Sequence, residues 1–167
     1  MKIIAIIGDH PRNIGLLKRL YDNKKVEICY LILFKRDKLI PEPDQNLSDS
    51  LKKLWKLHFE KRYLSEKKFF KFENDFIIKI KNKIIVSNEK ELHSKKVLEA
   101  INSVKADAAF ITGIPILKEP VLSALPINCI NLHLGIIPYY RGVFTIFWPF
   151  YFLEPTMAGT TFHIIDK

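Results

Sequence analysis

The chain contains little cysteine and little glycine. Its 167 residues include two cysteines, Cys29 and Cys129, and six glycines. Both cysteines lie in apolar, strand-like segments, so we expect no disulfide, and this usage favours a reducing compartment such as the cytoplasm. The turn after the first apolar segment, residues 8–13, is neither a GxGxxG nor a Walker loop, so it carries no standard nucleotide-binding motif.

Long apolar runs are also absent from the sequence. No apolar run approaches the roughly 18 to 20 residues that a membrane-spanning helix needs, so we expect no membrane partner. The opening segment 1–8 is too short for the core of a signal peptide and is typical of a buried strand. With 48% hydrophobic and 12% aromatic residues the chain is too apolar for disorder, and its length suits one domain over residues 1–167.

Acidic residues are outnumbered by basic ones. The chain has 27 lysines and arginines against 18 acidic residues, a formal net charge of +9. Most of the excess comes from lysines scattered over residues 35–96, without the interleaved aromatic residues or the recognised motif of a nucleic-acid-binding surface. We interpret these lysines as solvated surface and expect no nucleic-acid partner; steering of an anionic substrate and contact with RNA are the alternatives.

Strand-like and helix-like segments alternate along the chain. This pattern predicts an α/β, Rossmann-like fold with a mostly parallel sheet and helices on both faces. The predicted strands cover residues 2–7, 26–34, 106–112, 127–130 and 160–165, and the predicted helices cover 13–21, 51–70, 91–103, 118–125 and 143–152. Apolar and basic residues alternate over 76–86, around Lys81 and Asn82, which predicts an antiparallel hairpin.

One face of the long helix predicted over 51–70 carries four residues that recur at intervals of four. His58, Arg62, Glu66 and Phe70 share this face. Arg62 and Glu66 are spaced for an ion pair worth about 0.3 kcal/mol, and we interpret the face as helix surface.

Two polar residues, Asn131 and His133, follow a buried strand and precede a loop that contains Pro138 and Gly142. Residues two apart on a strand point to the same side, so both side chains would face one cleft. Open α/β sheets place their ligand sites at such strand ends. An imidazole that changes charge near neutral pH, beside an amide donor, favours acid–base and oxyanion chemistry. The alternatives are a core histidine and an asparagine that closes a loop.

Residues 131–142, Asn-Leu-His-Leu-Gly-Ile-Ile-Pro-Tyr-Tyr-Arg-Gly, resemble the formyltransferases that use N10-formyltetrahydrofolate. The hallmark of that family is Asn-x-His, a short apolar stretch, and Pro-x-x-Arg-Gly. The resemblance extends to residues 106–117 and 159–166, and the first hundred residues match only in outline. It implies N10-formyltetrahydrofolate as co-substrate, a primary amine as formyl acceptor, and Asn131 and His133 as catalytic residues.

The resemblance also implies which residues bind ligands. The loop that holds the pterin of the co-substrate corresponds to Gly113, Ile114, Pro115, Ile116 and Leu117. The acceptor side corresponds to Gly8, Asp9, His10, Tyr139, Tyr140 and Arg141. These residues also have structural interpretations. Residues 113–117 can form a turn that needs glycine and proline, residues 8–10 can form an ordinary strand–helix turn, and Arg141 can hold its own loop in place. No metal site is predicted, because the histidines lack partners at metal-ligand spacing.

The residues after Gly142 indicate which amine accepts the formyl group. The family branch that acts on methionyl-tRNA continues with small residues and proline, whereas residues 143–150 here are bulky and aromatic. This favours a nucleotide-linked amino sugar, with methionyl-tRNA or glycinamide ribonucleotide as the alternative acceptor. A catalytically inactive relative and a basic nucleic-acid-binding domain are alternatives of another class. Whether the protein forms a homodimer stays open.

The end of the chain departs from the family pattern. Asp166 matches the first aspartate of the family's His-x-x-Asp, and the catalytic aspartate would follow four residues later, beyond Lys167. We therefore expect the formyltransferase domain to be incomplete at its C-terminal end and this chain to be inactive by itself.

Overall fold

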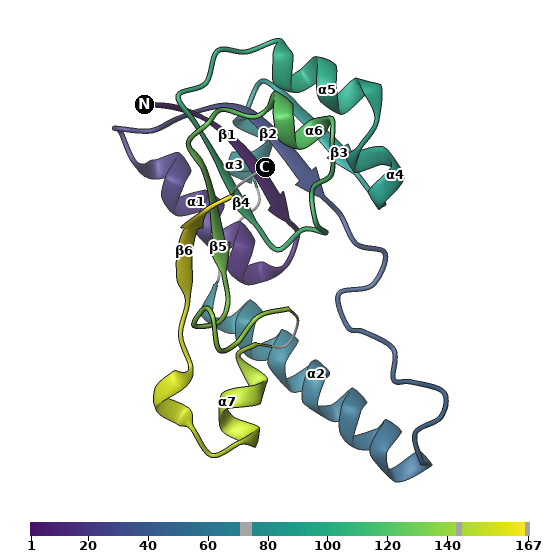
Figure 1. Cartoon of the computed structure of the whole chain (residues 1–167). Helices are drawn as coiled ribbons and strands as arrows, with labels where there is room; N and C mark the ends of the chain where they lie inside the picture. Colours follow the sequence, from purple (N-terminus) through teal and green to yellow (C-terminus); the bar gives the residue numbers. More distant parts are fainter. Residues whose placement is uncertain (71–74, 143–144, 166–167) are drawn as a thin grey trace.

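The structure, a computed structural model, describes residues 1–70, 75–142 and 145–165. Its centre is a six-stranded sheet with the strand order β3-β2-β1-β4-β5-β6 (Figure 1). Five strands pair in parallel, and the edge strand β6 runs antiparallel to β5. The strands are β1 (Lys2–Gly8), β2 (Glu27–Phe34), β3 (Lys83–Val86), β4 (Ala108–Thr112), β5 (Cys129–His133) and β6 (Thr161–Ile164). The predicted Rossmann-like, mostly parallel sheet is confirmed.

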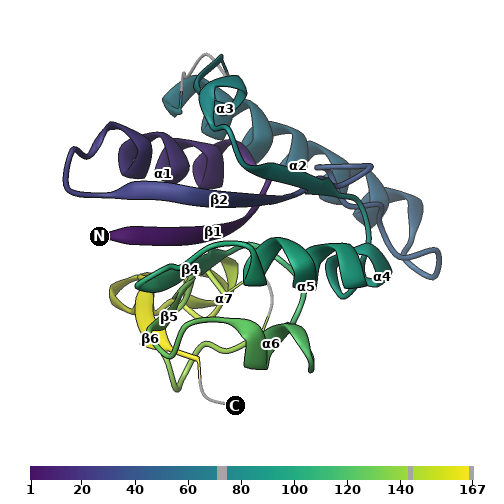
Figure 2. The same ribbon diagram turned by 90° about the horizontal axis from the view of Figure 1, so that it is seen from above.

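Helices cover both faces of the sheet (Figure 2). Because side chains alternate along a strand, Ile4 and Ile6 of β1 enter one core cluster and Ala5 and Ile7 enter the other. The first cluster packs under α4 (Glu89–Leu92), α5 (Lys95–Asn102) and α6 (Val121–Ala124), and the second under α1 (Pro11–Asp22) and α3 (Asp75–Lys79). Each fully buried isoleucine or leucine contributes roughly 1.5 to 3 kcal/mol to folding.

The antiparallel hairpin predicted over 76–86 is wrong. Residues Asp75–Lys79 form α3, and β3 then joins β2 in parallel. Phe76 and Ile80, one helical turn apart, are both buried in the core cluster beneath α1. The side-chain amide of Asn82 donates to the carbonyl of Cys29, which fixes the start of β3 beside β2.

The helix predicted over 91–103 is divided into α4 and α5. Asn88 starts α4 earlier than predicted, because its side-chain oxygen accepts a hydrogen bond from the Glu91 amide at 2.9 Å. Ser94 is the N-cap of α5. The helix predicted over 143–152 is α7 (Phe147–Tyr151); residues 143–144 lie outside the described part of the chain, as do Asp166 and Lys167.

The long helix predicted over 51–70 is confirmed as α2 (Asp49–Phe69), which extends away from the sheet near α7 (Figure 1). Its cap is Ser48, and none of its residues is fully buried. Trp55 donates its indole N–H to the Pro41 carbonyl at 2.9 Å, which ties the preceding segment to the helix. No helix in the described ranges is long and apolar enough to cross a membrane.

Candidate active site

A cleft of about 430 Å³ opens at the carboxyl ends of the parallel strands. Its walls come from the segments that follow β1, β2, β4 and β5, and from one face of α2. The strand order reverses between β1 and β4, and open α/β sheets bind ligands at such a switch point.

Asn131 lines this cleft and is held by a histidine on the neighbouring strand. It pairs with His163 across the β5–β6 ladder, and its amide nitrogen lies 3.0 Å from Nε2 of that ring. Nδ1 of His163 is bonded to the Ile164 carbonyl, which can only accept, so Nδ1 carries the hydrogen and Nε2 accepts from Asn131. One N–H of the Asn131 amide is thus engaged, and the second is left to donate to a ligand.

His133 lines the same cleft and is oriented by the loop that follows it. Its Nε2 donates to the Tyr140 carbonyl at 2.9 Å, which leaves Nδ1 as the acceptor of the neutral ring. Gly135 makes this approach feasible: a Cβ there would lie 2.5 Å from the Tyr140 oxygen and 2.9 Å from Nε2 of His133. The loop therefore sets the tautomer of His133 through a contact that only glycine permits.

The turns after β1 and β4 meet in backbone contact beside the cleft. A Cβ on Gly8 would lie 2.1 Å from the Gly113 carbonyl, and Gly113 itself has a positive φ of 65°. Arg36 reinforces the junction by donating to the Gly113 carbonyl at 2.7 Å. Asn13 is 1% exposed, and its side-chain nitrogen has no hydrogen-bond partner among the described residues. A buried amide left unpaired next to a cleft is suited to a ligand oxygen.

The N-terminus of α1 opens onto the cleft without a negative charge of its own. No acidic residue lies in its first turn, and the cap residue His10 makes no side-chain capping bond. Burial, reinforced by the charges of Arg12, Arg36 and Arg62, lowers the pKa of His10 to about 3, so this imidazole is neutral at physiological pH. Backbone N–H groups at a helix N-terminus favour anions.

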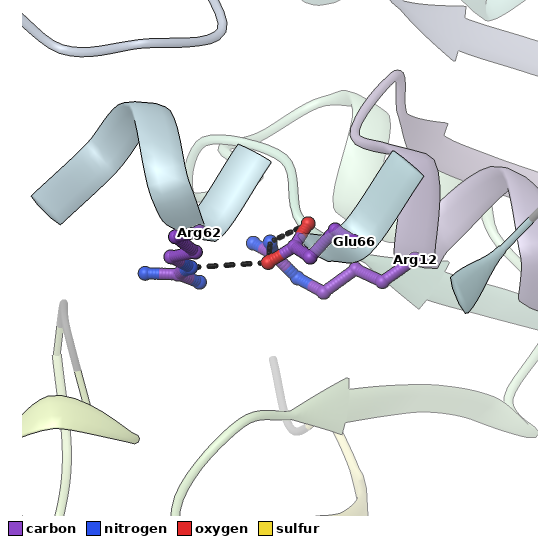
Figure 3. Close-up of polar contacts among 3 residues, drawn as sticks. All are labelled: Arg12, Arg62 and Glu66. Atoms are coloured by element: carbon purple, nitrogen blue, oxygen red, sulfur yellow. Dashed lines mark hydrogen bonds and ion pairs between the residues drawn. The ribbon is translucent and has the colours of Figure 1, made fainter. Parts of the chain in front are cut away.

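Two arginines of the cleft share one carboxylate (Figure 3). Nη1 of Arg12, on α1, donates to both oxygens of Glu66, on α2, at 2.6 and 2.8 Å. Nε of Arg62 donates to the same carboxylate at 3.0 Å. The predicted Arg62–Glu66 pair is therefore present, but it lines a cleft, and its third member comes from another helix.

The cleft brings together part of the predicted site. Both residues predicted to be catalytic, Asn131 and His133, line it, as do Gly113, Ile114 and His10. The remaining predicted residues are not on its wall: Gly8, Asp9, Pro115, Ile116, Leu117, Tyr139, Tyr140 and Arg141. Tyr140 acts on the site through its carbonyl, Gly8 through the junction with Gly113, and Asp9 by accepting from the Arg36 amide at 3.1 Å.

Sequence reasoning missed the wall that α2 supplies. Phe59, Arg62, Tyr63 and Glu66 recur at helical spacing on the side of α2 that faces the cleft. The four-residue spacing of polar groups was visible in the sequence, but the same spacing occurs on solvated helix surfaces. The role of His163 as the partner of Asn131 was also missed, because it depends on the register of β6 against β5.

No protein-family model matches the sequence, and no curated protein matches it. Solved structures do match. Phosphoribosylglycinamide formyltransferase from Anaplasma phagocytophilum aligns with a TM-score of 0.60 at 14% identity, covering 100% of this chain and 65% of that one. Glycinamide ribonucleotide transformylase 1 from Symbiobacterium toebii aligns with a TM-score of 0.56 at 15% identity, covering 99% and 66%.

The corresponding enzyme from Geobacillus kaustophilus has a TM-score of 0.57 at 15% identity, with 99% of this chain and 74% of that one covered. The chain thus spans just under two thirds of the length of the first two of these proteins. Similarity at these identities concerns the arrangement of strands and helices. This chain has the α/β fold of the phosphoribosylglycinamide formyltransferases.

Proposed function

We propose that the protein transfers a formyl group from N10-formyltetrahydrofolate to a primary amine. The observation that carries the proposal is the pair Asn131 and His133, side by side on one cleft at the end of β5. The shared fold supports it, because the structural neighbours are named as formyltransferases. The co-substrate supplies the formyl carbon, and the residues of this chain position the groups that react.

The two side chains have separate parts in this proposal. Attack of an amine on the formyl carbon places negative charge on the formyl oxygen and positive charge on the nitrogen. The amide N–H of Asn131 that His163 leaves unused donates to that oxygen. The acceptor nitrogen of His133 takes the proton that the attacking amine loses and returns it to N10 as the bond between N10 and the formyl carbon breaks, so the amine becomes a formamide and tetrahydrofolate leaves. The Tyr140 carbonyl keeps the ring in position.

The loop after β4 fits the co-substrate in part. Gly113 and Ile114 line the cleft and offer backbone groups and an apolar side chain to a flat pterin. Ile116 is 83% exposed, and Leu117 packs against the core, so these two are weaker candidates for contact. We assign the pterin contact to the first two residues of the loop.

The acceptor that we propose carries phosphate. The described walls of the cleft are strongly positive. They carry four basic side chains, Arg12, Arg36, Lys38 and Arg62, and one carboxylate, that of Glu66. A positive cleft concentrates anionic substrates. The primary candidate is a nucleotide-linked amino sugar. Glycinamide ribonucleotide is the second candidate, favoured by the names of the structural neighbours, and methionyl-tRNA is the alternative that the sequence left open.

The direct test uses the polypeptide that the gene encodes in full, a 10-formyl folate analogue, and a panel of phosphorylated amines. Mass spectrometry of the amine products reports transfer. We expect saturable formylation of one class of acceptor, lost on substitution of His133→Asn with folate binding retained. A protein that binds no reduced folate and shows steeply salt-dependent RNA binding would overturn the proposal in favour of a nucleic-acid-binding domain. Folate binding without transfer to any amine would indicate an inactive relative.

A further inference from the structure

The Arg12–Glu66–Arg62 cluster differs from an ordinary surface ion pair, because all three side chains line the cleft. We propose that Glu66 is a displaceable stand-in for the diphosphate of a nucleotide-linked acceptor, which replaces it on Arg12 and Arg62. The inference rests on the proposed function, since the diphosphate joins the reacting sugar to the nucleoside.

The carboxylate of Glu66 occupies these arginines as an anionic ligand would. It accepts from Nη1 of Arg12 through both oxygens and from Nε of Arg62 (Figure 3). Its side chain is 16% exposed. Guanidinium groups bind carboxylate and phosphoryl oxygens with the same donor geometry. Glu66 therefore keeps two guanidinium groups in an anion-binding arrangement and at the same time competes with an incoming anion.

The competition favours a ligand with more than one negative charge. Nε of Arg12 is buried and has no hydrogen-bond partner within the described ranges, so the Glu66 carboxylate leaves this donor unsatisfied. A singly charged anion that displaced Glu66 would bring the same charge to the arginines, so it would gain no electrostatic advantage. A diphosphate brings additional charge and oxygens, which can bond both guanidinium groups and interact with the nearby Arg36 and Lys38.

A second hollow adjoins the cleft. It measures about 480 Å³, lies between α2 and the segment 38–42, and shares Lys38, Leu39, Pro41 and Tyr63 with the first cleft. Asn131 and His133 line only the first cleft.

A ligand whose amine reacts at Asn131 and His133 can thus extend along the cleft into the second hollow, through the side chains that the two share. The apolar and aromatic side chains shared there suit a nucleoside. A phosphoribosyl amine ends at its phosphate and leaves this hollow unused, which is why the proposal names a diphosphate.

The test measures binding by calorimetry without any folate, using UDP, UMP, inorganic pyrophosphate and orthophosphate as probes. We expect UDP to bind at least about tenfold more tightly than UMP. Arg62→Gln should weaken UDP binding roughly 10- to 100-fold, which is the cost of losing a charged hydrogen bond. Glu66→Gln should tighten the binding of UDP and pyrophosphate by about tenfold, because it removes the competing charge and preserves the shape.

Matched variants separate the proposal from its alternatives. Arg19→Gln removes the same charge from an exposed position of α1 outside the cleft and should leave every affinity unchanged. Tyr63→Ala should weaken UDP and leave pyrophosphate unaffected. Thermal unfolding confirms that each variant is folded before its affinity is compared.

Two results would overturn the inference. If Glu66→Gln leaves UDP binding unchanged or weakens it, Glu66 is only a tie between α1 and α2. If UMP binds as tightly as UDP, the arginines recognise a single phosphate. Formylation of a phosphoribosyl amine without UDP binding would sink this inference and leave the proposed reaction intact. If UDP binds with the expected variant effects but no formyl transfer occurs, the proposed reaction is overturned and the inference about Glu66 stands.

Discussion

The orientation of Asn131 depends on a residue 32 positions away in the chain. His163 accepts one N–H of its amide, and the Ile164 carbonyl fixes the tautomer of His163 through Nδ1. An unsupported asparagine amide can rotate, and only a fixed donor stabilises an oxyanion without reorganisation. In the proposed reaction, His163 is therefore a positioning residue, and Asn131 is the residue that touches the reacting oxygen.

Substitutions at these two positions should not be additive. We predict that Asn131→Ala lowers kcat about 10²- to 10³-fold, the usual cost of one oxyanion donor. His163→Ala should lower kcat about tenfold, since the donor stays but loses its orientation, and the double variant should match Asn131→Ala alone. Steady-state kinetics of all three variants provide the check. Multiplicative losses would show that His163 acts independently of Asn131.

At the scale of elements, the loop between β5 and α7 controls His133. A Cβ on Gly135 would lie 2.5 Å from the Tyr140 carbonyl and 2.8 Å from Cβ of Thr145, and neither atom is the end of a flexible side chain. The Tyr140 carbonyl is also the acceptor for His133. Movement of the loop must therefore move the histidine or break its bond.

We predict that Gly135→Ala destabilises the protein by about 1 to 3 kcal/mol, the usual cost of overpacking, and abolishes formyl transfer. Gly159→Ala is the matched control, because its Cβ would meet only the Ile136 side chain, at 3.0 to 3.1 Å. Urea denaturation and a transfer assay test both variants. Equal losses of stability in the two variants would contradict the proposed role of the Gly135 contact.

The helix boundaries show which local signals the sequence contained. Asn88 and Glu91 together cap the start of α4. The Asn88 side chain accepts from the Glu91 amide, while Glu91 Oε2 accepts from the Ser87 amide at 2.8 Å and Oε1 accepts from the Asn88 side chain. This three-residue spacing is visible in the sequence, although the helix was predicted to begin only at residue 91. The apolar and basic alternation over 76–86 was misleading, because the burial of Phe76 and Ile80 beneath α1 outweighs the strand-like pattern.

At the scale of the whole molecule, the basic wall of the cleft affects stability as well as binding. Burial, together with Arg12, Arg36 and Arg62, lowers the pKa of His10 from 6.5 to about 3. As the pH falls below 6.5, the unfolded chain protonates this residue while the folded protein does not. Stability is therefore present above pH 6.5 and is lost as the pH falls toward 3.

We predict that the free energy of unfolding falls between pH 7 and pH 5 by about 1 to 2 kcal/mol more in the unmodified protein than in the His10→Gln variant. This magnitude allows for partial solvent screening. Urea denaturation at both pH values measures the difference. Asp9, whose pKa is raised by burial, titrates in both proteins and cancels in the comparison. Parallel pH profiles for the two proteins would show that His10 is protonated as easily in the fold as in the unfolded chain.

The sequence by itself determined every strand of the sheet except β3, and it placed Asn131 and His133 at one strand end. Buried strands are coded by local apolar runs, and residues two apart on a strand necessarily share a side, so the placement of Asn131 and His133 followed from spacing alone. Only the tertiary structure decided the basic wall. Arg12 and Glu66 are 54 positions apart, and they meet because α2 packs beside α1. Contacts between elements depend on how the helices are placed against the sheet, and no local pattern of residues encodes that placement.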